Sequence, residues 1–160
     1  MSVWGAIVGG FAGTLVLSTA LSGASVLHFT RMDIPFLLGT VFTKNRSRAK
    51  VVGYSVHAGF GLVFALGYYG IFAVIGHAGW LAGMIFGVAH GLFAGTALVN
   101  VLLPAVHPLM GNDYTAADAP AYLEAPGFML LNYGRTTPVV TLLAHMAYGA
   151  IVGECIRLAS

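Results

Sequence analysis

The chain has 160 residues, of which 58% are hydrophobic and 8% charged, with seven Lys and Arg against five Asp and Glu. A soluble domain carries about 25% charged residues, so these few charges exclude a water-soluble globular protein. The bases gather in one segment without interleaved aromatic residues, which excludes nucleic acid as a partner. The single cysteine, Cys155, excludes an intramolecular disulfide and any CxxC motif.

Four apolar runs are each long enough to cross a bilayer, which takes about 20 residues. They span residues 3–28, 51–75, 80–103 and 138–156. The first run lacks the positively charged start of a cleavable signal and is too long for one, so we expect a membrane span there. None of the runs alternates apolar and polar residues as barrel strands do, and helices are the other structure that satisfies the backbone in lipid. We predict an all-α polytopic membrane protein, with residues 1–160 forming a single transmembrane domain of four helices.

The connections between the runs differ in length and charge. A short turn at 76–79 forces the second and third runs into an antiparallel hairpin. The charged loop 29–50 and the long loop 104–137 together hold six of the seven bases. The positive-inside rule counts Lys and Arg, so we predict that both loops are cytoplasmic and both termini outside. In the long loop we expect short interfacial helices, with a flexible linker as the alternative.

Glycine recurs at every fourth position in two of the runs. Small residues let helix backbones approach closely in lipid, where packing drives association. We therefore predict a helix-packing role for these glycines, with the third run facing the first and the ends of its stripe free to meet another chain. The glycines that carry this prediction are Gly83, Gly87 and Gly91 in the third run, and Gly5, Gly9 and Gly13 in the first.

The second and fourth runs share a short motif. His57 to Gly61 and His145 to Gly149 both read His-x-x-aromatic-Gly, each about two turns into its helix, and each follows a glycine-striped run. A duplicated helix hairpin would give this pattern, and chance similarity is the alternative.

Six histidines in so apolar a chain need an explanation. Hydrogen bonds between helices are the plainest one, because a neutral imidazole bonds readily to neighbouring helices. A more specific hypothesis makes His57 and His145 axial ligands of haem b or another tetrapyrrole, since a glycine one turn away from each leaves room for a flat ring. Two others remain open: a transition-metal site using His107 and Met110, and a proton path.

The sequence contains no GxxxxGK[ST], HExxH or GxSxG motif. The stretches His57 to Phe64, His107 to Gly111 and Thr141 to Gly153 resemble small four-span bacterial inner-membrane proteins of uncharacterised families. The resemblance implies a four-helix topology in a bacterial inner membrane and carries no known activity.

Our leading functional prediction is a non-catalytic accessory or structural subunit of a larger membrane complex. Its partners would be the lipid bilayer and other membrane subunits, or a second copy of the chain. The alternative is a histidine-ligated, haem-binding redox protein, and the third hypothesis is a small transporter or channel with Asn100 among its few polar residues.

Overall fold

The computed structural model describes residues 1–110 and 123–159, and over them the chain is all-helical. Four helices are long and apolar enough to cross a membrane, which confirms the predicted fold class and is compatible with an integral membrane protein. The long elements are α1 (Val3–Val26), α3 (Arg46–Ile75), α4 (Trp80–Phe93) continued by the π-helix η1 (Ala94–Leu102) and α5 (Leu103–Val106), and α6 (Thr137–Leu158). The short ones are α2 (Ile34–Gly39) and the 3₁₀-helix η2 (Phe128–Tyr133).

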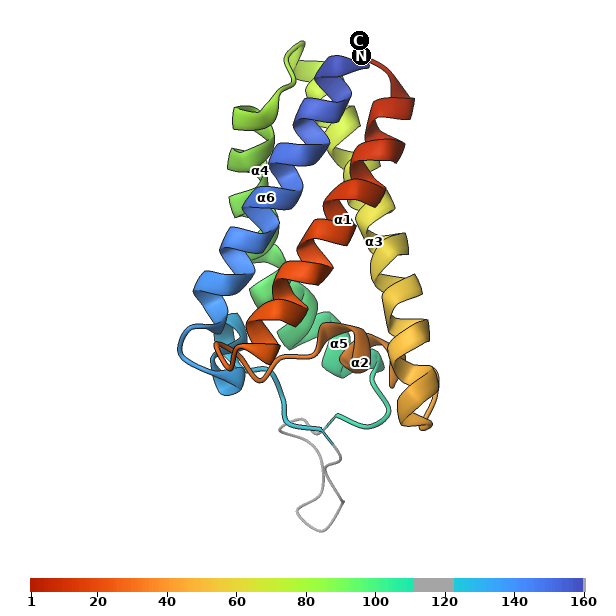
Figure 1. Ribbon diagram of the computed structural model, residues 1–160, viewed down its shortest axis with the longest axis vertical. Helices are drawn as coiled ribbons and strands as arrows, with labels where there is room; N and C mark the ends of the chain where they lie inside the picture. The colour runs from red at the N-terminus through yellow and green to blue at the C-terminus, as the bar shows by residue number, and fades with distance from the viewer. Residues whose placement is uncertain (111–122, 160) are drawn as a thin grey trace.

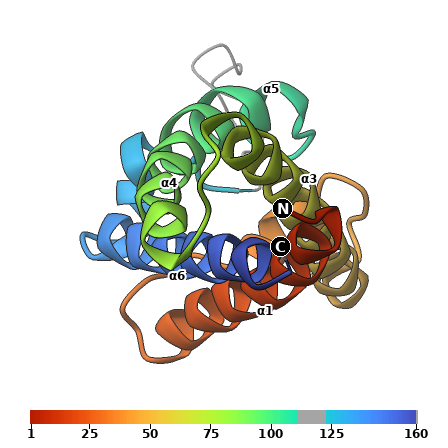
Figure 2. The ribbon, with the colours of Figure 1, turned by 90° about the horizontal axis from the view of Figure 1, so that it is seen from above.

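The four long helices form a bundle in which neighbours along the chain run in opposite directions (Figure 1). Both termini lie at the end of the bundle that also carries the α3–α4 turn, and α2 and α5 lie at the opposite end. Seen along the bundle, α6 packs against both α1 and α4, and α3 packs against α1 (Figure 2). The helix α6 therefore joins the two halves of the bundle.

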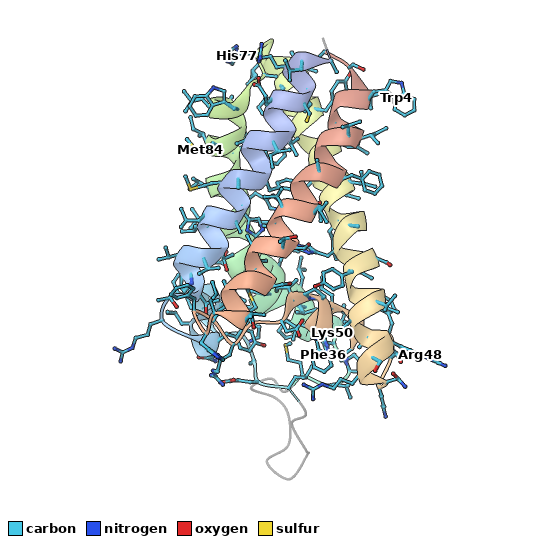
Figure 3. All side chains as sticks on the ribbon, in the orientation of Figure 1. Trp4, Phe36, Arg48, Lys50, His77 and Met84 are labelled. Carbon is cyan, nitrogen blue, oxygen red and sulfur yellow. The ribbon has the colours of Figure 1, made fainter. Side chains whose placement is uncertain are left out.

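The helix α3 begins five residues before the predicted span. Asn45 caps it, because its side-chain oxygen accepts the backbone N–H of Arg48 at 3.0 Å. Three bases of the charged loop consequently lie on a helix, and Arg48 and Lys50 gather at the end of the bundle away from the termini (Figure 3). Lys50 is paired with Asp33 at 2.9 Å, and this ion pair ties the start of α2 to α3.

The helix α1 ends at Val26, two residues before the predicted limit. His28 adopts a left-handed backbone with φ of 61°, and the next N–H, of Phe29, turns back to the carbonyl of Ala24 at 2.9 Å. Such a closure satisfies carbonyls at the end of a helix, so the helix stops there although the sequence stays apolar.

The prediction that the glycines of the first apolar run pack against those of the third is wrong, because both sets pack against α6. A Cβ added at Gly83 or Gly87 would overlap the carbonyl oxygen of Gly149 or His145 on α6. A Cβ added at Gly9 on α1 would lie 3.0 Å from Val152 Cα, also on α6. The α6 helix has small residues of its own along these contacts, so three helix backbones approach one another instead of two.

The α3–α4 hairpin is joined by a short turn but is held open by aromatic side chains. Gly76, with φ of 70°, ends α3 in a left-handed conformation. Beyond the turn the two backbones make few close contacts, and rings fill the space between them. Tyr68 and Phe72 of α3 stack edge-on to Phe86 of α4, with ring centroids 5.9 and 5.4 Å apart. These rings hold the two helices apart.

The long loop contributes η2 to the end of the bundle, where Met129 and Leu130 are buried and the η2 backbone packs against η1 and α6. Both residues adopt left-handed backbone angles, with φ of 51° and 64°. Residues 111–122 in the middle of the long loop lie outside the described part of the chain.

Candidate functional site: a cavity lined by three histidines

A cavity of about 340 Å³ lies inside the bundle on the side where α3 and α4 are held apart. Apolar side chains of α1, α2, α3, η1 and α5 form most of its wall. Its polar lining comes from three histidines and a threonine on three different helices: His57, His90, Thr141 and His145. Among the residues that the structure describes, no Asp, Glu, Lys or Arg lines it. The cavity is thus an apolar chamber with a small set of neutral polar groups.

The π-helix η1 forms one wall of the cavity. A π-helix of nine residues is unusual, since most are single turns and many of those occur at functional sites. Asn100 stabilises this wider turn by donating its side-chain amide to the carbonyl of Gly95 at 2.9 Å. Ala94, Leu98 and Leu102 of this segment line the cavity, so the widened backbone and the chamber coincide.

The predicted pair of site residues, His57 and His145, both line this cavity. The Nδ1 atom of His57 lies 3.0 Å from the hydroxyl of Ser18 on α1. The Nδ1 atom of His145 lies 2.8 Å from the carbonyl oxygen of Thr141. Because a carbonyl only accepts, Nδ1 of His145 carries the proton, and its Nε2 is a free acceptor when the ring is neutral.

A third histidine, His90, belongs to the same cluster, although no motif in the sequence marks it. Its ring centroid lies 4.8 Å from that of His145 and 3.9 Å from that of Phe64. Its Nδ1 atom is buried and has no hydrogen-bond partner among residues 1–110 and 123–159. Its spacing in the sequence indicates its position: His90 follows Phe86 by four residues, so both side chains lie on the face of the helix that is directed toward α3.

Two hydroxyl groups complete the polar surroundings of the histidines. Thr141 is 2% exposed, and its Oγ1 has no hydrogen-bond partner in the described part of the chain. Tyr148 is fully buried and donates its hydroxyl to the carbonyl of Gly61 at 2.5 Å, which connects α6 to α3. Thr141 is therefore a polar group in the cavity wall that nothing in the described chain satisfies.

The two His-x-x-aromatic-Gly motifs occupy comparable positions in the bundle. A Cβ at Gly61 would overlap the Thr14 hydroxyl on α1, and a Cβ at Gly149 would overlap the Gly83 carbonyl on α4. Each motif glycine thus contacts the long helix that precedes its own, and each motif histidine turns to the cavity. This arrangement agrees with a duplicated hairpin, which stays a prediction.

His107 and Met110, the residues of the predicted metal site, lie apart from the cavity at the α2 end of the bundle. Nε2 of His107 donates to the Leu37 carbonyl at 3.1 Å, with the hydroxyl of Thr40 also 3.1 Å away. Its Nδ1 accepts the N–H of Leu109 at 3.1 Å. Both nitrogens of the ring are occupied, so metal binding there would require one of these bonds to break. Burial lowers the pKa of His107 below its ordinary value of 6.5, although the bond to the Leu37 carbonyl opposes this shift.

Comparison of the chain with known protein families, with curated proteins and with solved structures gives no match. The resemblance to four-span bacterial families stays a prediction. Within the described residues, no three His, Cys, Asp or Glu side chains are placed to hold a metal ion together.

Proposed function

We propose that the protein is a non-catalytic accessory subunit of a larger membrane complex and docks through the outer face of α3. The observation that carries this proposal is a set of three glycines, Gly59, Gly67 and Gly70, at which an added Cβ would meet no described atom within 4 Å. At about 100° per residue they fall on one side of the helix. No contact among the described residues requires a glycine at these three positions.

Glycines on a lipid-facing surface bring no benefit to an isolated helix, since glycine is about 1 kcal/mol less favourable than alanine there. At a helix–helix contact they allow the backbones to approach. The glycine stripes of α1 and α4 already serve contacts with α6, and the open glycine of α1, Gly23, is a single residue. The three open glycines of α3 are therefore the set left for another chain. That chain is another membrane subunit or a second copy, and the remaining apolar surface faces lipid.

The test is substitution of Gly67 by Leu, with Gly23→Leu on α1 as the matched control. Both glycines have open surroundings among the described residues, so neither change should unfold the chain. Native gel electrophoresis of mild-detergent extracts, with the chain at its natural expression level, should show a large complex for the wild type and Gly23→Leu. Gly67→Leu should release the chain from it. A wild-type chain that migrates alone, or a Gly67→Leu chain that stays in the complex, would contradict the proposal.

A second candidate function is a tetrapyrrole-binding redox protein, favoured by the shared position of His57 and His145 in one cavity. In each ring Nδ1 has a neighbour in the chain, and Nε2 is the remaining atom that could bind a metal. Ligating histidines usually hold their second nitrogen in this way. Against this candidate, the His90 ring lies 4.8 Å from that of His145, so a macrocycle bound there would share the chamber with it. A Soret band in the purified protein, lost in His57→Ala and His145→Ala, would establish this function in place of the first.

We also propose that the protein lies in a bacterial inner membrane with the α2 end of the bundle cytoplasmic and both termini outside. Arg31, Lys44 and Arg135 belong to the connections at that end of the bundle. Arg48 and Lys50 at the start of α3 lie at the same end (Figure 3). At the other end Arg157 is paired with Glu154 at 2.5 Å. The positive-inside rule favours this orientation.

A further inference from the structure

We propose that the cavity between α3, η1 and α6 binds a neutral, lipid-soluble molecule whose flat, oxygen-bearing ring, as in a quinone, accepts hydrogen bonds from Thr141 and His90. Small-molecule sites are mostly apolar chambers with a few placed polar groups. This chamber has a volume of about 340 Å³, within the usual range of about 300–1,000 Å³ for such sites.

The unpartnered polar atoms locate the ligand's polar group. Thr141 Oγ1 and His90 Nδ1 are both buried without a hydrogen-bond partner among the described residues, and both side chains line the cavity. Buried polar groups in folded proteins are nearly always satisfied. A ligand carbonyl oxygen placed between α4 and α6 would satisfy them, and Nε2 of His145 would accept a bond only from a ligand with a hydroxyl group, such as a quinol.

The lining also selects the charge of the ligand. In the described part of the chain no Asp, Glu, Lys or Arg lines the cavity wall, and an ion placed there would lack a permanent counter-charge. Removing an unpaired charge from water is strongly unfavourable. The lining therefore favours a neutral carbonyl or hydroxyl compound over a fatty acid anion or an amine.

Aromatic side chains favour a flat ring over a simple alkyl chain. Phe60, Phe64 and Tyr148 line the cavity beside the histidines, and aromatic faces and edges pack well against planar groups. Away from the histidines the wall is aliphatic, with Leu17 and Leu21 from α1 and Leu102 from η1. A ring with a short apolar tail matches both parts of the wall.

The test is calorimetric titration of the full chain in lipid nanodiscs with a benzoquinone that carries one isoprene unit, and with a hydrocarbon of similar size. We expect the quinone to bind more tightly than the hydrocarbon. Thr141→Val should weaken quinone binding about tenfold, the effect of losing one buried hydrogen bond. His90→Phe should weaken it similarly, and Leu98→Phe, which fills the apolar wall, should abolish it.

The matched control is Thr96→Val, because Thr96 bonds to the Leu92 carbonyl at 2.6 Å and does not line the cavity. It should bind the quinone as the wild type does. Thermal unfolding of each variant shows whether it is folded, and Thr141→Val conserves shape. Equal affinity for quinone and hydrocarbon, or wild-type affinity in a folded Thr141→Val variant, would overturn the proposal. Because Gly67→Leu leaves the cavity unchanged, failure of the docking proposal would be seen separately.

Discussion

Gly83 of α4 and Gly149 of α6 each face the other's carbonyl oxygen. A Cβ added to either residue would overlap the oxygen of its partner, so the two backbones touch at this point. Lipid provides no hydrophobic force to drive helices together, and close packing of backbones takes its place. The reciprocal contact explains why both positions carry glycine.

We predict that Gly149→Ala destabilises the bundle by about 1–3 kcal/mol, the usual effect of overpacking a tight contact. Leu92→Ala, at a side chain 45% exposed, should change stability by about 0.5 kcal/mol or less. Unfolding of the purified protein in mixed detergent micelles measures both. Wild-type stability of Gly149→Ala would mean that the α4–α6 contact is looser than described.

The position of His107 predicts loosening of the α2 end in acid. Its pKa is lowered in the folded state, so the unfolded or undocked chain binds the proton more readily. The stabilising effect of neutral His107 is therefore complete above its ordinary pKa of 6.5 and is lost as the pH falls below it. Hydrogen exchange of the α2 amides, corrected for intrinsic rates, should accelerate between pH 7.5 and 5.5.

The control for this effect is His107→Gln, which retains a donor for the Leu37 carbonyl and does not titrate. Exchange in α2 should then lose most of its dependence on pH. An unchanged dependence in this variant would assign the effect to another group.

The charged residues of the first loop should divide into two functional kinds. Lys44 and Arg48 are exposed, and near an anionic membrane surface each should contribute about 1 kcal/mol to lipid binding. Lys50 pairs with Asp33, and an exposed pair contributes about 0–1 kcal/mol to stability. Binding of anionic lipid to the detergent-solubilised protein should fall in the Lys44→Gln and Arg48→Gln variants, whereas Lys50→Gln should mainly increase exchange in α2. Equal lipid binding by all three variants would refute this division.

Reporter fusions test the orientation of the bundle. With the basic end cytoplasmic, a reporter placed after Lys44 should report the cytoplasm, and one placed after Ser160 should report the outside. The reason is the asymmetry of the bases, six of which lie in the first and third loops or at the start of α3. The same compartment for both reporters would require an even number of spans between them and would contradict the predicted topology, which has three.

Composition and length predicted the four helices because bilayer thickness requires runs of this kind. The helix ends were less predictable, since they depend on local hydrogen bonds such as the Asn45 cap and on the left-handed backbone of His28. The partner of each glycine stripe could not be predicted, because α1, α4 and α6 all carry small residues and several pairings satisfy that pattern. His57 and His145 were selected by their shared motif. His90 was overlooked because its contact with His145 depends on how α4 packs on α6.

Native mass spectrometry of the protein, extracted from its own membrane directly into lipid nanodiscs, tests the accessory-subunit proposal most directly. We predict a species that contains this chain together with at least one further protein chain, and its loss in Gly67→Leu but not in Gly23→Leu. A wild-type spectrum of single chains that carry only lipid would contradict it.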